Sequence, residues 1–179
     1  LELPHLEHLN LQGTALTNAD AEAIGHLSSL KVLSLEKTAI TDAGLPHLRG
    51  LAELQTLYLG ESRVRGEGLE VLAEFPQLKY VSLRKLELSD ASLASLAVCT
   101  GIEYLGLDET SVTDRGLPHL SHLPKLKVLW LTGTSVSDDG LRHLKVFRNL
   151  EKLFIRGTAV SEEAALRLRK AMHDVSLTH

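Results

Sequence analysis

The sequence predicts an α/β fold: a right-handed β/α solenoid with a parallel sheet on its concave face and short helices on its convex face. Leucine makes up 39 of the 179 residues, well above its ordinary share of protein composition. Apolar residues recur every 24 positions from Leu6 to Leu150, which divides the chain into seven units. Seven positions of the unit are apolar in every copy, a pattern typical of stacked repeats that share one continuous core.

Positions three to six of each unit, counted from its apolar leader, should form a strand. Positions four and six are both apolar and lie two residues apart, so their side chains point to the same, inner side. Positions three, five and seven then face outward. The expected strands cover residues 8–11, 32–35, 56–59, 80–83, 104–107, 128–131 and 152–155.

The second half of each unit should form a short helix. Positions sixteen, nineteen and twenty-two place an apolar stripe at helical spacing, turned toward the same core. Pro46 and Pro118 near the helix start favour a late beginning or a 3₁₀ turn. Because helices pack more widely than strands, the stack should bend with the strands inside. Expected N-caps are Thr41-Asp42, Thr113-Asp114, Ser137-Asp138 and Ser161-Glu162.

Position nine carries a hydroxyl in six of the seven units, and these hydroxyls should bond backbone groups of the nearby loops. Leu86 breaks this row, and the same unit has Ser92 where most units have glycine at position fifteen. Residues 84–88 therefore form either a slightly re-routed loop or a recognition bulge.

Cys99 falls in a core column and should be an inert, buried thiol.

The units read L-x-x-L-x-L-x-x-T, followed by a T/S-D-x-G-L segment. This pattern resembles the leucine-rich repeat family, and its length is most similar to bacterial repeats of the ribonuclease-inhibitor-like or GALA type. The family has Asn or Cys where this chain has Thr. The resemblance implies a horseshoe fold and a binding role. It makes residues 1–179 one domain, with seven units over 6–173 and a partial eighth strand over 174–179.

Composition and motifs argue against several functions. The net charge of −4 gives little support for nucleic-acid binding, and no apolar run is long enough to span a membrane. His47, His119 and His143 share position eighteen on the convex face without convergent ligands, so neither a metal site nor a cofactor is expected. No nucleophile has a base beside it, so we expect no catalytic residues and no enzymatic activity.

The start of the chain carries no signal-peptide pattern, and its only methionine is Met172. The chain is therefore expected to be a processed product or a fragment of a longer protein. With a single cysteine, no internal disulfide can form, which favours an intracellular location, while secretion stays open.

The aromatic residues suggest a binding surface. Of the seven, Phe75 and Phe147 occupy a core column, and the other five lie in the outward columns of the strands. Tyrosine, tryptophan and arginine dominate the energetics of protein interfaces. We therefore expect an exposed band that binds a protein or peptide partner, with Trp130 as its best anchor. The partner-binding residues are Tyr58, Tyr80, Arg84, Tyr104, Asp108, Trp130, Phe154 and Arg156.

Three other interpretations of the same residues stay open. The aromatic residues could serve only cross-strand packing, which they also favour in sheets. The chain could be a structural or assembly segment of a larger protein that associates with itself through the ends of the solenoid. The aromatic band could also hold a carbohydrate or another small ligand.

Overall fold

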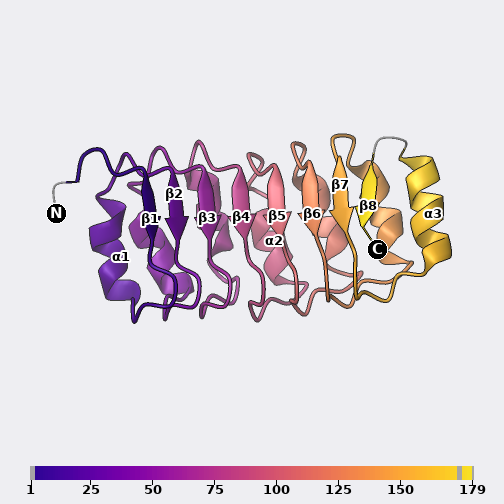
Figure 1. The fold of residues 1–179 in the computed structure, drawn as a ribbon, viewed down its shortest axis with the longest axis horizontal. Helices are drawn as coiled ribbons and strands as arrows, with labels where there is room; N and C mark the ends of the chain where they lie inside the picture. The colour runs from indigo at the N-terminus through magenta and orange to yellow at the C-terminus, as the bar shows by residue number, and fades with distance from the viewer. Residues whose placement is uncertain (1–2, 173–174, 179) are drawn as a thin grey trace.

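The computed structural model describes residues 3–172 and 175–178. One strand and one short helix alternate in each unit of 24 residues. The strands stand side by side on one face of an elongated molecule, with helices behind them and the first and last helices at opposite ends (Figure 1). The molecule is thus the right-handed β/α solenoid that the sequence predicts.

The eight strands form one parallel sheet in chain order. Each residue pairs with the residue 24 positions further on, as Leu33 does with Leu57. The strands end one residue earlier than expected, but the position-six amide still bonds the next strand: the Leu35 N–H donates to the Tyr58 carbonyl at 2.9 Å. Strand bounds are His8–Asn10 (β1), Val32–Ser34 (β2), Thr56–Tyr58 (β3), Tyr80–Ser82 (β4), Tyr104–Gly106 (β5), Val128–Trp130 (β6), Lys152–Phe154 (β7) and Ser176–Thr178 (β8).

Strand β8 lies within the range 174–179 expected for a partial eighth strand. Residues 174 and 179 of that range, and residue 173 of the seventh unit, lie outside the described residues.

The inward columns build the core: Leu33, Leu35 and Leu105 are fully buried. Cys99 is 2% exposed in its core column, as expected.

The convex side mixes two kinds of helix. The α-helices are Asn18–Gly25 (α1), Ser92–Leu96 (α2) and Glu162–Ala171 (α3), and the 3₁₀ helices are Asp42–Leu48 (η1), Leu69–Glu74 (η2), Leu117–His122 (η3) and Gly140–Val146 (η4). Pro46 lies inside η1 and Pro118 near the start of η3, in line with the expected 3₁₀ turns. Helices η2 and η4 contain no proline, so the short span that the unit leaves for its helix must contribute as well.

Three of the four expected N-caps are wrong. Only Ser161 caps its own helix, where its Oγ accepts the Ala164 N–H at 3.1 Å. The position-thirteen side chain instead points along the solenoid to the next unit. Asp114 accepts the Ser137 N–H at 2.7 Å and the Ser137 hydroxyl at 2.5 Å. We call this contact the interunit clamp; its other pairs are Asn18–Thr41, Asp42–Arg65, Asp90–Thr113 and Asp138–Ser161.

The clamp row is interrupted at Gly66, which has no side chain to offer and a φ of +93°. Ser92 of the following unit makes the link instead, with its hydroxyl donating to the Arg65 carbonyl at 2.9 Å. In clamped units, that position must be small: a Cβ at Gly116 would lie 2.6 Å from Asp90 Oδ1. The fourth unit can have Ser92 where other units need glycine, because the preceding unit has Gly66 and therefore no carboxylate that would collide with a larger residue.

The hydroxyl row at position nine is confirmed. The hydroxyls donate to the carbonyl three residues earlier, at 2.7 Å each, in Thr38, Thr110, Thr134 and Thr158. Leu86 fills the same place with a side chain that is 3% exposed, and Lys85 before it keeps the φ of +56° found at Glu61 and Glu109. Residues 84–88 thus follow the course of the neighbouring loops, and the expected re-routing or bulge is absent because the leucine enters the core.

Candidate partner-binding face

The five outward aromatic residues form one continuous band across strands β3 to β7. Ring centroids lie 5.2 Å apart for Tyr58 and Tyr80, and 6.2 Å apart for Tyr80 and Tyr104. Trp130 meets Tyr80 edge-on at 5.9 Å and stacks on Phe154 at 5.4 Å, with ring planes 6° apart. These separations and angles are those that aromatic pairs prefer. We call these five residues the aromatic band.

Gly106 explains how the band closes across the sheet. Tyr80 and Trp130 come from β4 and β6, which are not neighbours, and Gly106 on β5 pairs with Trp130. Because Gly106 has no side chain, the indole can cross β5 and reach Tyr80. A Cβ at Gly106 would lie 3.6 Å from Ser82 and 3.8 Å from Asp108 Oδ2, at ordinary contact distance.

The band is less exposed than we expected. All five residues are half-buried, because each ring covers part of its neighbour. Ser34 and Ser82, the two neighbours of Tyr58 in the same column, are buried. The rings therefore contribute to stability as well as to the surface, since aromatic pairs are worth about 0.5–1.5 kcal/mol each beyond their buried area.

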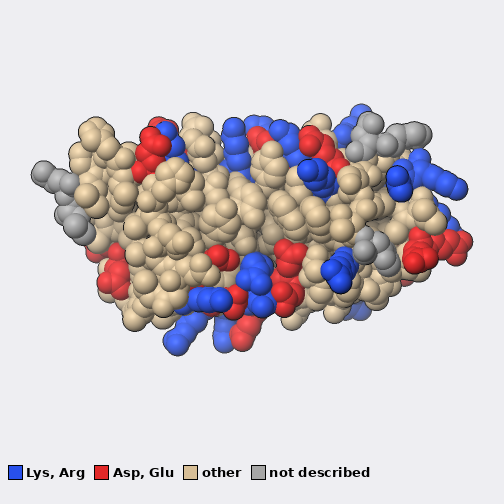
Figure 2. Space-filling model, viewed as in Figure 1, with Lys and Arg blue, Asp and Glu red and all other residues tan. Residues whose placement is uncertain are grey.

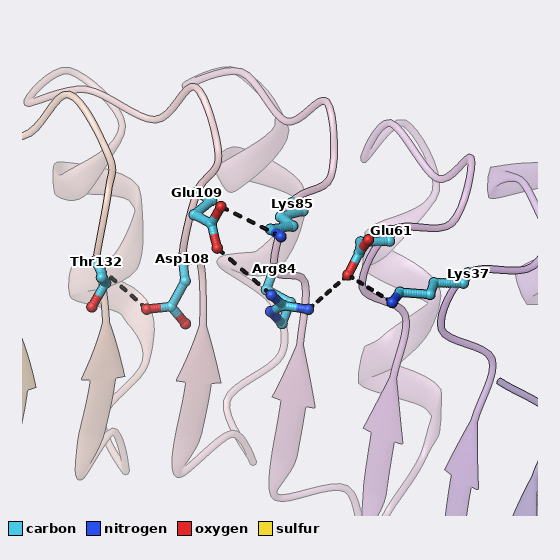
Figure 3. A network of polar contacts seen from close by, with 7 residues as sticks. All are labelled: Lys37, Glu61, Arg84, Lys85, Asp108, Glu109 and Thr132. Atoms are coloured by element: carbon cyan, nitrogen blue, oxygen red, sulfur yellow. Dashed lines mark hydrogen bonds and ion pairs between the residues drawn. The ribbon is translucent and has the colours of Figure 1, made fainter. Parts of the chain in front are cut away.

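Charged residues border the band on one side. Arg84 at the end of β4 donates to Glu61 at 2.8 Å and lies 3.6 Å from Glu109 (Figure 3). Lys85 is 3.5 Å from Glu109, and Lys37 is 3.8 Å from Glu61. Arg84 is thus held in place by two carboxylates. On the face seen in Figure 2, charged side chains gather mainly toward the two long edges and leave the middle uncharged.

Position eight of the unit carries an unusual backbone conformation. Four charged residues in consecutive units, Lys37, Glu61, Lys85 and Glu109, have φ between 55° and 56°. In this left-handed region a residue with a side chain is disfavoured by about 1–2 kcal/mol. Exposed ion pairs stabilise a protein by only about 0–1 kcal/mol. The ion pairs therefore do not offset the backbone cost, and stability alone does not explain why these units lack glycine. Glycine does occupy the position in other units, at Gly13, Gly133 and Gly157.

Asp108 differs from the other charged residues of this border. Its side chain turns toward β6, where Oδ1 accepts the Thr132 N–H at 3.2 Å (Figure 3). Burial raises the pKa of the Asp108 carboxyl, against the hydrogen bonds from Thr132 and the charge of Arg84. Burial also raises the pKa of Tyr80, assisted by Tyr58, Asp108 and Glu36. Burial is thus the main cause for both groups, and the negative charges of Asp108 and Glu36 act in addition on Tyr80.

The eighth expected site residue, Arg156, follows β7 and is exposed. The structure thus brings Tyr58, Tyr80, Tyr104, Trp130 and Phe154 together with Arg84 and Asp108 beside them. The position-eight row was missed at the sequence level. An alternation of Lys and Glu in a column that is otherwise glycine was the signal that could have revealed it.

One hollow among the described residues lies beside the charged border and has no aromatic residue in its lining. It measures about 950 Å³ and is lined by loop residues that include Arg63, Lys85 and Asp42. Arg65 and Glu87 on its wall pair at 3.1 Å, with side chains 70% and 80% exposed. Because these long side chains are largely exposed and paired with each other, we place the candidate site on the aromatic band.

Residues 3–172 and 175–178 contain no group of three or more His, Cys, Asp or Glu that could hold a metal ion. Burial raises the pKa of the Cys99 thiol to about 12, which leaves almost no thiolate at neutral pH. Over the same described ranges, no helix combines the length and hydrophobicity needed to cross a bilayer.

Comparison with known proteins agrees with this geometry. A family profile described as leucine-rich repeat matches residues 4–64. The internalin InlF structure from Listeria monocytogenes superposes with a TM-score of 0.69 at 19% identity, over 96% of this chain and 53% of that chain. Internalin C2 from the same organism gives a TM-score of 0.66 at 22% identity, over 96% of this chain and 80% of the other. A search of curated proteins found no significant match.

The periodic core, the single parallel sheet and the aromatic band together define a solenoid with one differentiated face. Residues 4–64 match the leucine-rich repeat family profile, and the described part of the chain has the fold of leucine-rich repeat proteins. The chain spans about half the length of the InlF chain, and the likeness to the two internalins extends to the fold. The assignment to a 24-residue bacterial subtype stays a prediction.

Proposed function

We propose that this chain is a non-enzymatic protein-binding module that recognises a folded partner or a peptide through the concave face of its sheet. The observation that carries the proposal is the aromatic band. The five aromatic residues outside the core share one face and form one connected set of ring contacts across five strands, in which Tyr80 contacts Tyr58, Tyr104 and Trp130, and Trp130 contacts Phe154. A distribution without a functional cause would scatter some of them onto the convex helices.

The order of the band favours tight binding. Rings that are already stacked lose little conformational entropy when a partner binds, and this lower entropic cost increases the affinity. Trp130 touches both Phe154 and Tyr80, so it is held in place from two directions. Large aromatic residues in such settings are the usual hot spots of interfaces.

The charged border supports the same function. Residues held in a disfavoured backbone region cluster at functional sites, and here four of them line one side of the aromatic band. Their alternating signs give a charge pattern that a complementary partner can read. Such a pattern would set the orientation and association rate of the partner more than its affinity.

Packing between strands is the main competing explanation, and the ring contacts show that packing does occur. It does not account for the position-eight row, whose charged side chains are 28–51% exposed and whose backbone adopts a disfavoured conformation. Packing and binding are also compatible, because half-buried rings retain an exposed surface.

Site-specific photocrosslinking tests the proposal. A benzoylphenylalanine in place of Tyr104 puts an aromatic crosslinker within the band, and the same residue in place of His143 puts it on the exposed surface of η4. Exposed to native extract, the Tyr104→benzoylphenylalanine protein should yield a discrete adduct that the His143 variant does not. An adduct formed only from position 143 would place the binding surface on the convex side.

A further inference from the structure

Within the candidate site, Asp108 is a half-buried carboxylate that makes no ion pair with a described lysine or arginine, although the charge of Arg84 still acts on it. Its Oδ1 accepts one backbone N–H, from Thr132, at 3.2 Å. Among the described residues, no lysine or arginine lies within ion-pair distance of it, because Arg84 is directed to Glu61 and Glu109. A charge that is partly removed from water and left unpaired disfavours the folded state.

The surroundings of Asp108 suit a cation. Its Oδ2 lies 3.8 Å from the position that a Cβ would take at Gly106, so this oxygen leans over β5 toward the aromatic band. The rings of Trp130 and Tyr80 meet across β5, the strand that carries Gly106. The faces of Trp and Tyr rings attract cations, and the attraction grows as the site is shielded from water.

A second carboxylate adds to the negative charge that acts on Tyr80. A Cβ at Gly60 would lie 2.8 Å from Glu36 Oε1, so the Glu36 side chain reaches across β3 toward the middle of the sheet. Glu36 also makes no ion pair with a described lysine or arginine. Arg84, which lies in the same column of the sheet between Glu36 and Asp108, is already shared between two other carboxylates, Glu61 and Glu109.

We propose that the partner inserts an arginine side chain at this point, pairing its guanidinium with Asp108 and stacking it against the aromatic band at Trp130 and Tyr80. This inference rests on the proposed function and specifies the chemistry of the partner. A guanidinium fits better than an ammonium, because it is planar, stacks on aromatic faces, gives up water more readily and can bond a carboxylate with two N–H groups. An acidic partner residue at the same point would meet Asp108 and Glu36 of like charge.

The chain provides its own reporter for a test. Trp130 is the only tryptophan, so its fluorescence reports the proposed arginine site directly. The probes are three capped tripeptides, Gly-Arg-Gly, Gly-Gln-Gly and Gly-Glu-Gly, titrated at low ionic strength. The variants are Asp108→Asn, which keeps an oxygen for Thr132, and Glu87→Gln, a carboxylate with an 80% exposed side chain that serves as the matched control.

We expect a saturable change in Trp130 fluorescence with Gly-Arg-Gly and none with Gly-Glu-Gly. The dissociation constant should rise about tenfold or more in Asp108→Asn, stay unchanged in Glu87→Gln, and rise with added salt. An equal response to Gly-Gln-Gly, no response to any peptide, or unchanged binding by Asp108→Asn would each overturn the proposal. These results leave the proposed function standing if Tyr104→benzoylphenylalanine still captures its partner, so the two failures can be told apart.

Discussion

At one boundary between units, Gly66 leaves room for Ser92, whose hydroxyl links the two units. Replacing Asp90 with glycine and Gly116 with serine should create the same arrangement at the next boundary. The single change Asp90→Gly removes the acceptor for the Thr113 N–H at 2.7 Å and the Thr113 hydroxyl at 2.6 Å. Lost bonds to a charged group cost about 1.5–3 kcal/mol. The glycine adds about 0.5–1 kcal/mol of backbone entropy.

Gly116→Ser alone should also destabilise the protein. The new Cβ would lie 2.6 Å from Asp90 Oδ1 and 2.9 Å from Leu93 Cδ1, and overpacking of this kind costs about 1–3 kcal/mol. In the double variant the obstructing carboxylate is gone and the serine hydroxyl can link the units. The loss should then be smaller than the sum of the single losses by about 1 kcal/mol or more.

Urea unfolding of the four proteins measures this coupling, provided that the dependence on urea concentration is the same in all of them. The wild type and the two single variants are the controls for the double variant. Losses that add to within about 0.5 kcal/mol, the usual limit for independent sites, would show that the glycine and the carboxylate do not exclude each other.

Three further predictions concern single residues. Thr110→Val should lower the free energy of unfolding by about 1 kcal/mol, because the Leu107 carbonyl loses its bond; no change in urea would refute it. Native Cys99, with its pKa raised by burial to about 12, should react with a thiol reagent at pH 8 only after unfolding, and rapid labelling would contradict its burial. Because burial raises the pKa of Asp108, its ionisation disfavours the native state as pH rises through that pKa. Asp108→Asn should therefore raise the Tm at pH 7, and the gain should shrink on acidification toward the ordinary aspartate pKa; a constant or reversed difference would show that the carboxylate is not desolvated.

The period and the core columns were predictable because they repeat. Each unit states the same pattern of buried leucines, so Leu33 and Leu57 could be assigned to adjacent strands without any structure. The threonine row was predictable for the same reason, and its bonds to the carbonyl three residues earlier are local. Information confined to one unit was enough in both cases.

The clamps could not be predicted from local rules. A Ser-Asp or Thr-Asp pair before a helix is ordinarily a cap, yet Asp114 bonds Ser137, which is 23 residues away in the chain. Whether Asp114 bonds its own helix or the next unit depends on where the free N–H of Ser137 lies in the folded stack. The exposure of the aromatic band was overestimated for a related reason: whether Trp130 covers Tyr80 depends on rotamers and on the absent side chain of Gly106, not on the outward column alone.

The affinity of Trp130→Ala for the partner captured at position 104 tests the central claim most directly. Thr110→Val is the control, since it should lose stability without altering the aromatic band. We expect Trp130→Ala to lose about 1–3 kcal/mol of stability through its two ring contacts. Its binding should weaken by about 2 kcal/mol or more, while Thr110→Val binds as the wild type does. Binding that survives Trp130→Ala but is lost on changing His119 and His143 would contradict the account and move the site to the convex helices.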